Sequence, residues 1–184
     1  MRIISGNFKG KKINLPKDQL TRPLKDIVKE SIFNIIEHSN VIKLDIKKSL
    51  ILDLFSGSGS FGLECLSRGA ERVIFNEKYN LAINVLERNI KNLNCENKCE
   101  ILKSDCFELY KNFNQKVDII FIDPPFKEKK INELIDMIIK MKILKKDSLI
   151  IIHRNKKNQE FLNNKLNIID TRYYGLSKII FANH

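Results

Sequence analysis

Residues 50–69 read LILDLFSGSGSFGLECLSRG, and this stretch decides the fold. The run LILDLF has the continuous hydrophobicity of a strand buried on both faces of a parallel sheet. Closely spaced glycines follow it in SGSGSFG, and the segment FGLECLSRG then shows helical spacing. A strand, a tight glycine turn and a helix in this order predict the first crossover of a doubly wound α/β domain.

The alternation of strand and helix continues along the chain. Further strands are predicted at RVIFNE (72–77), CEILKS (99–104), VDIIFID (117–123) and SLIIIH (148–153), with helical spacing at 81–93, 106–113 and 131–144. After a helix around residues 158–164, LNIIDTRYY and SKIIFANH predict two strands joined at Gly175. Seven strands ending in an antiparallel hairpin are typical of the Rossmann-like α/β fold of S-adenosylmethionine-dependent methyltransferases, whereas dinucleotide dehydrogenases have six.

Residues 1–48 differ from the rest in charge and pattern. The 184-residue chain has a net charge of +11, and residues 1–48 hold 11 basic and 5 acidic side chains, more than half of that excess. RIISGNFKGKKINLP predicts a short β-hairpin near Gly6–Gly10, and an amphipathic helix is predicted over 26–37. We therefore divide the chain into a basic, RNA-facing extension (1–48) and a catalytic domain (49–184). The basic excess favours a polyanion partner, although biased codon usage would also enrich lysine.

Several classes of protein are disfavoured by composition. No apolar run approaches the roughly 20 residues that a membrane helix needs, and the N-terminus lacks the apolar core of a signal peptide. We expect a cytoplasmic protein with no membrane partner. Four cysteines, Cys65, Cys95, Cys99 and Cys106, include one C-x-x-x-C pair without a second pair or a neighbouring histidine. We therefore expect reduced thiols and no metal site.

The glycine loop predicts a nucleotide-type ligand. Gly57, Gly59 and Gly62 satisfy G-x-G-x-x-G, and Glu77 lies 24 residues after Asp53, where its carboxylate can accept hydrogen bonds from ribose hydroxyls. This combination fits NAD and S-adenosylmethionine alike. Asp53 favours the second, because a carboxylate before the glycines suits the cationic amino-acid end of S-adenosylmethionine and would repel a pyrophosphate.

The third predicted strand adds a further polar residue. Asp105 follows Ser104 at its end, and it is interpreted either as a contact to the adenine edge or as a helix N-cap. The predicted donor-binding set is Asp53, Phe55, Gly57, Ser58, Gly59, Glu77, Lys78, Asp105 and Cys106.

The fourth predicted strand ends in Asp123-Pro124-Pro125-Phe126. Neither proline has the N–H needed to continue a sheet ladder, so the chain must leave the sheet in a rigid turn. Ligands of open α/β sheets bind at the carboxyl ends of the strands, which places this turn beside the glycine loop. Asp123 and the Pro124 carbonyl would accept hydrogen bonds from an amine of a flipped base, and Phe126 would stack on it. The turn predicts in-line methyl transfer to a planar amine.

With the glycine loop followed by the Asp-Pro-Pro-Phe turn, the chain resembles the amino-methyltransferases, which modify adenine N6, cytosine N4 or guanine N2. More narrowly it resembles the RsmD family of bacterial 16S ribosomal RNA guanine-N2 methyltransferases, in RIISGNFKGKKI, TRPLKDIVKESIFNII, DLFSGSGSFGLECLSRGA and DIIFIDPPF. The resemblance implies S-adenosylmethionine as donor and a guanine of the small ribosomal subunit as acceptor. It also implies that Asp53, Gly57, Gly59 and Glu77 bind the donor. We expect a monomer.

RNA contacts are expected from the extension, at Lys9, Lys11, Lys12, Arg22 and Lys29, each of which has a plain solvated charge as its alternative interpretation. His153-Arg154 departs from the family, where many relatives are expected to carry an acidic residue, and His153 is interpreted as a strand-end surface residue rather than a catalytic base. Three rival functions remain open. They are a DNA or RNA adenine-N6 or cytosine-N4 methyltransferase, a nicotinamide oxidoreductase, which leaves the Asp-Pro-Pro-Phe turn unexplained, and a catalytically silent RNA-binding module.

Overall fold

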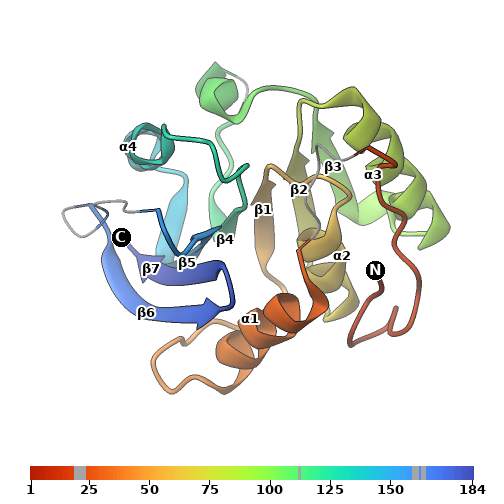
Figure 1. Ribbon diagram of the computed structural model, residues 1–184, viewed down its shortest axis with the longest axis horizontal. Coiled ribbons are helices and arrows are strands. Elements are labelled where there is room, and N and C mark those ends of the chain that lie inside the picture. The colour runs from red at the N-terminus through yellow and green to blue at the C-terminus, as the bar shows by residue number, and fades with distance from the viewer. Residues whose placement is uncertain (19–23, 112, 159–161, 163–164) are drawn as a thin grey trace.

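The computed structural model describes residues 1–18, 24–111, 113–158, 162 and 165–184. Its centre is a seven-stranded sheet in the order β3-β2-β1-β4-β5-β7-β6 (Figure 1). The strands are β1 (Leu50–Leu54), β2 (Arg72–Asn76), β3 (Cys99–Leu102), β4 (Val117–Ile122), β5 (Leu144–Asn155), β6 (Asn167–Tyr174) and β7 (Ser177–Asn183). The first five run parallel, and β7 lies antiparallel between β5 and β6. The predicted seven-stranded α/β fold with a terminal antiparallel hairpin is confirmed.

The helices follow the predicted order, with two differences from the prediction. They are α1 (Asp26–His38), α2 (Ser60–Ser67), α3 (Asn80–Asn92) and α4 (Ile131–Met141), with 3-10 turns η1 (Glu96–Lys98) and η2 (Cys106–Lys111). The segment 106–113, expected to be α-helical, forms the short η2 instead. Helix α4 ends early because Lys142 adopts a left-handed conformation with φ of 53°, and β5 begins two residues later. The helix predicted around 158–164 falls mostly outside the described residues.

Two hydrophobic clusters cover the two faces of the sheet. Alternate residues of β4 point to opposite faces, so Ile119 and Phe121 join one cluster while Ile120 and Ile122 join the other. Helices α1 and α2 pack on the first face and α4 on the second. None of the helices in the described ranges is long and apolar enough to cross a membrane.

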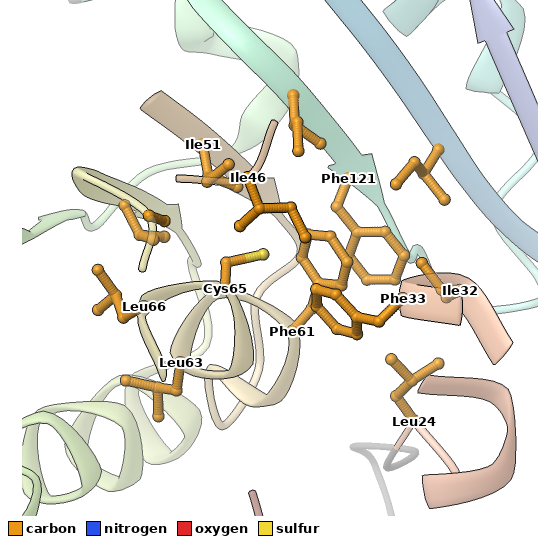
Figure 2. Close-up of a cluster of buried hydrophobic side chains, with 14 of the residues drawn as sticks. Leu24, Ile32, Phe33, Ile46, Ile51, Phe61, Leu63, Cys65, Leu66 and Phe121 are labelled. Carbon is orange, nitrogen blue, oxygen red and sulfur yellow. The ribbon is translucent and has the colours of Figure 1, made fainter. Parts of the chain in front are cut away.

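The N-terminal residues pack on this same core. Figure 2 shows the stacked rings of Phe33 from α1, Phe61 from α2 and Phe121 from β4, with centroids 5.3 Å and 4.0 Å apart. The predicted N-terminal hairpin is reduced to a single antiparallel bridge, between Arg2 and Lys12. Burial of α1 against α2 and β4 therefore fastens the basic segment to the sheet, while its boundary at residue 48 stays a prediction.

Candidate active site

The carboxyl ends of four parallel strands lie side by side at one edge of the sheet, and the residues that follow them form the candidate site. The sheet register aligns Leu54, Asn76, Ile122 and Ile152, the residues near the carboxyl ends of β1, β2, β4 and β5. The residues that follow them in β2, β4 and β5 are Glu77, Asp123 and His153. Side chains from positions almost eighty residues apart in sequence are thus brought to one edge of the sheet.

The loop after β1 is held in an unusual conformation. Phe55, Gly57 and Gly59 all have positive φ angles, of 58°, 55° and 81°. A Cβ on Gly59 would lie 2.4 Å from the Cδ1 atom of Leu86, whereas a Cβ on Gly57 would meet nothing within 4 Å. Packing therefore requires glycine at position 59. Position 57 borders open space at the edge of the site. A bulky residue such as Phe55 in the left-handed region is strained, which is common where a loop is shaped for a ligand.

Asp53 lies beneath this loop. Its side chain is 1% exposed, and its Oδ2 accepts a hydrogen bond from the N–H of Gly62 at 3.0 Å. Burial raises the pKa of Asp53 well above its ordinary value, the Gly62 hydrogen bond opposes this shift, and the negative charges of Asp123 and Glu77 add to it. Three carboxylates therefore converge on one place, which favours a cationic ligand.

Glu77 joins the glycine loop to the start of α3. Its Oε2 accepts a hydrogen bond from the N–H of Gly57 at 2.8 Å, and its Oε1 accepts from the N–H groups of Lys78 and Tyr79, both at 2.9 Å. A carboxylate has about four acceptor positions, so these three bonds leave about one position for a ribose hydroxyl.

Asp105 accepts a hydrogen bond from the first turn of η2, which is the capping role predicted as one of its two alternatives. It also forms an ion pair with Lys78, another residue of the predicted donor-binding set. Its Oδ1 accepts from the N–H of Phe107 at 3.1 Å, and its Oδ2 lies 2.8 Å from the Nζ of Lys78. Burial raises the pKa of Asp105, but the Lys78 pair and the Phe107 hydrogen bond outweigh it and hold that pKa below its ordinary value. The Phe107 ring meets Phe55 edge-on at 6.4 Å, a partnership that the sequence did not indicate.

Cys106 departs from its predicted donor contact. Its side chain is 3% exposed and belongs to the hydrophobic cluster with Leu109 and Ile120. Burial raises the pKa of its thiol, so the neutral form is favoured. The thiol therefore contributes packing, and a donor contact of Cys106 stays a prediction.

The N-terminal segment is fastened to the glycine loop through Asn89 of α3. The Nδ2 of Asn89 donates to the carbonyl of Ser58 at 2.9 Å and to that of Asn14 at 3.0 Å, and its Oδ1 accepts from the N–H of Asn14 at 2.9 Å. Nearby, the hydroxyl of Tyr79 donates to Asp18 at 3.1 Å. Ser58 itself is buried. Sequence reasoning missed this link, because an asparagine in a helix carries no local signal of its partners.

The Asp-Pro-Pro-Phe turn leaves β4 beside this loop. The N–H of Asp123 approaches the carbonyl of Leu54 at 3.4 Å, which ties the turn to the end of β1. Pro124 is buried, Pro125 is exposed and Phe126 is half-buried. The predicted neighbourhood of glycine loop and turn is therefore present in the structure.

The prediction that His153 is a strand-end surface residue is wrong. His153 is 0% exposed and Arg154 is 1% exposed. The Nδ1 of His153 lies 2.8 Å from Oδ1 of Asp123, and its Nε2 lies 2.9 Å from the Oγ of Ser177. Arg154 donates to the carbonyl of Pro125 at 3.3 Å and to that of Glu128 at 2.6 Å. Strand β5 continues to Asn155 and is paired with β7 there, so both residues lie inside the sheet and not at a free strand end.

The expected RNA-binding residues separate into three groups. Lys9, Lys11 and Lys12 are exposed on the N-terminal segment, as the expectation requires. Arg22 lies outside the described residues. Lys29 is 0% exposed, which contradicts its predicted RNA-facing role.

Lys29 instead belongs to a buried ion network around Glu64 of α2. Its Nζ lies 3.3 Å from Oε2 of Glu64, whose carboxylate also accepts from the backbone N–H groups of Ile4 at 2.8 Å and Ser5 at 2.9 Å, and from Nε of Arg68 at 3.1 Å. Desolvation lowers the pKa of Lys29, and the charge of Glu64 partly offsets that shift. The lysine was misinterpreted because its contacts come from segments distant in sequence.

The described residues were also compared with the ligand sets that bind metal ions. Within the described ranges, no group of three or more His, Cys, Asp or Glu side chains is placed to hold a metal ion. All four cysteines are free, and the sulfurs of Cys95 and Cys99 lie 3.9 Å apart.

Comparison with known proteins identifies the family. A family model described as conserved hypothetical protein 95 matches residues 1–183. The chain belongs to this family. The predicted RsmD membership is confirmed, since a Buchnera aphidicola protein named ribosomal RNA small subunit methyltransferase D is 36% identical over 156 residues, covering 84% of this chain and 78% of that protein. The Haemophilus influenzae protein of the same name is 32% identical, covering 85% of this chain and 79% of that protein.

A solved structure agrees with these relatives. The Haemophilus influenzae protein titled "putative methylase" has a TM-score of 0.78 at 29% sequence identity, and the match covers 98% of this chain and 96% of that one. The methyltransferase fold predicted from the strand pattern is therefore confirmed.

Proposed function

We propose that this protein transfers a methyl group from S-adenosylmethionine to the exocyclic N2 amine of a guanine in 16S ribosomal RNA. The observation that carries the proposal is the position of the Asp-Pro-Pro-Phe turn, tied to the end of β1 beside a glycine loop with three converging carboxylates. The names of the relatives, which describe small-subunit rRNA methyltransferases, support the RNA substrate. We further propose that the enzyme is cytoplasmic and acts as a monomer.

The donor half of the site fits a cationic nucleoside. Asp53 and Glu77 present carboxylates for an ammonium group and for ribose hydroxyls, and Gly57 leaves the space beside its Cα open. Asp105 and Phe107 lie at the end of β3, where an adenine edge would be met. When bound, the donor supplies a methyl group made electrophilic by the sulfonium.

The acceptor half is the rigid turn. An amine conjugated with a base ring is a weak nucleophile, because its lone pair is delocalised. Asp123 and the carbonyl of Pro124 would each accept one N–H of the amine, which favours a more tetrahedral nitrogen and directs its lone pair. The methylated nitrogen is acidic and loses its proton after transfer, with Asp123 as the nearest acceptor. Phe126, half-buried, would stack on the base.

Exposed lysines surround this turn and suit an RNA backbone. We name as turn-side lysines Lys127, Lys129, Lys130, Lys156 and Lys157, all exposed in the loops after β4 and β5. The Nδ2 of Asn158 donates to the carbonyl of Phe126 at 3.2 Å, which holds these two loops together beside the turn. Together with the exposed lysines of the N-terminal segment, they would contact phosphates around the flipped base. The exposed Lys43 and Lys47, which precede β1 at the opposite end of the strands, serve as far-side lysines for comparison.

The test uses tritiated S-adenosylmethionine with small subunits lacking the modification, naked 16S rRNA and duplex DNA offered in parallel. Digestion and chromatography then identify the labelled nucleoside. The expected product is N2-methylguanosine, only from the ribosomal substrates, and its loss in Asp123→Ala with donor binding retained. Label in N6-methyladenine would overturn the guanine assignment, and label in duplex DNA would overturn the RNA assignment.

A further inference from the structure

We propose that His153 is a positioning residue for methyl transfer. Its imidazole fixes the orientation of the Asp123 carboxylate, and Ser177 in turn fixes the imidazole. The inference rests on the proposed function, since it assigns a role within that reaction. It is carried by hydrogen bonds that His153 makes with side chains of two other strand ends.

The ring of His153 is fully buried and held from both sides. Its Nδ1 lies 2.8 Å from Asp123 at the end of β4, and its Nε2 lies 2.9 Å from Ser177 at the start of β7, which is itself 5% exposed. The antiparallel register pairs His153 with Ile179 and Asn155 with Ser177. Strand pairing therefore places the serine and the aspartate on opposite sides of one imidazole.

The chemistry of the partners sets the direction of each bond. An ionised carboxylate only accepts hydrogen bonds, so Nδ1–H of His153 donates to Asp123. In the neutral ring Nε2 then accepts, and the hydroxyl of Ser177 donates to it. Ser177 thus selects the tautomer that carries its proton on Nδ1, which is the tautomer that Asp123 requires.

Orientation of Asp123 needs such support. Pro124 and Pro125 restrict the backbone of the turn, but they leave the rotamer of the aspartate undetermined. The negative charges of Asp53 and Asp123 lie close enough to repel each other. The N–H of His153 opposes this repulsion, because it favours one position of the Asp123 carboxylate.

Other contacts from the same segment hold the backbone of the turn. Arg154 donates to the carbonyls of Pro125 and Glu128, and Asn158 donates to that of Phe126. The ring of His153 also meets Phe126 edge-on, with centroids 5.9 Å apart. The end of β5 and the residues after it therefore support the whole catalytic turn, and His153 is the member that acts on the side chain of Asp123.

The test compares two replacements of His153 with the same replacements at the exposed His38. His153→Phe keeps an aromatic ring beside Phe126 and removes both hydrogen bonds. It is expected to lower kcat by about 100-fold, the effect of a displaced catalytic group of order 1 Å, with donor affinity changed less than about threefold. His153→Gln, whose amide can donate to Asp123 and accept from Ser177, is expected to recover activity to within about tenfold of the unmodified protein. His38→Phe and His38→Gln should leave kcat unchanged.

A second measurement detects the hydrogen bond between His153 and Asp123 without enzymatic turnover. Nitrogen-15 NMR of the imidazoles in the full chain is expected to show His153 protonated on Nδ1, and Asp123→Ala is expected to shift that signal. An unchanged kcat in His153→Phe, an equal loss in His153→Gln, or a His153 signal indifferent to Asp123→Ala would each overturn the inference. If the unmodified protein methylates no ribosomal substrate, the proposed function fails, and the NMR result still decides the link between His153 and Asp123.

Discussion

Replacement of Glu64 by alanine is expected to release the N-terminal segment from the sheet. The Glu64 carboxylate is fully buried on α2 and is the meeting point of four donors. It accepts from the N–H groups of Ile4 and Ser5, at 2.8 and 2.9 Å, and lies 3.3 Å from Nζ of Lys29 and 3.1 Å from Nε of Arg68. The Nζ of Lys29 on α1 adds to this link, since it also donates to the carbonyl of Arg2 at 2.8 Å, so Glu64 and Lys29 together join the chain terminus, α1 and α2.

The expected cost follows from the burial of both charges. Removing one partner of a buried ion pair leaves an uncompensated charge and costs about 3–5 kcal/mol. Ile4 and Ser5 are only half-buried, so water can partly replace the acceptor that their N–H groups lose. A loss of this size lowers the Tm by roughly 6–20 °C, since 1 kcal/mol corresponds to about 2–4 °C in a domain of this length.

The matched control is Glu37→Ala. Glu37 pairs with the same Arg68 at 2.6 Å, but its side chain is 38% exposed, so its removal is expected to cost less than about 1 kcal/mol. Urea unfolding of both variants, followed by circular dichroism, gives the two free energies of unfolding. Glu64→Gln, which keeps an acceptor, should fall between them. A Glu64→Ala protein no less stable than Glu37→Ala would refute the reasoning.

Three further predictions concern the site. The proposed cationic donor is expected to bind the ionised form of Asp53, whose pKa is raised by burial. Calorimetry should therefore show donor affinity rising, with proton release, as the pH rises through that pKa, and Asp53→Asn should abolish this dependence. Gly57→Ala should weaken donor binding and cost about 1 kcal/mol of stability, because an alanine at a φ of 55° is strained although its Cβ would meet nothing. Gly59→Ala carries the same strain and adds a collision of its Cβ with Leu86 of α3, so it should cost about 1–3 kcal/mol more in urea unfolding; equal stabilities would contradict this. Exchange of the turn-side lysines Lys127 and Lys129 for glutamine should reduce the slope of log affinity for rRNA against log salt concentration by about 1.4. The same exchange at two far-side lysines should leave it unchanged, and equal slopes would exclude the turn-side surface.

The fold and the two central motifs were predictable because their signals are local. Continuous apolar runs indicate strands buried on both faces, and the length of the alternation gives the number of strands. The glycine loop and the Asp-Pro-Pro-Phe turn each follow such a strand directly. Since parallel strands present their carboxyl ends at one edge, Asp53, Glu77 and Asp123 were expected to lie near one another, and the aligned ends of β1, β2 and β4 place them at that edge.

Partners of buried polar residues were beyond prediction. His153 looked like a strand end on the surface, and Lys29 looked like a solvated charge, because a polar residue after an apolar run or on a helix is usually exposed. Their burial depends on which element covers them, β7 in the first case and the N-terminal segment with α2 in the second.

The sequence by itself therefore determined the seven-stranded fold, the glycine loop and the Asp-Pro-Pro-Phe turn, since each depends on contiguous residues with a strict conformational preference. Only the tertiary structure decided that His153 and Ser177 support Asp123, that Cys106 packs in the core and that Glu64 fastens the N-terminus. These contacts join positions up to 60 residues apart. Hydrogen bonds of this kind are selected by packing of whole elements, and no local pattern specifies them.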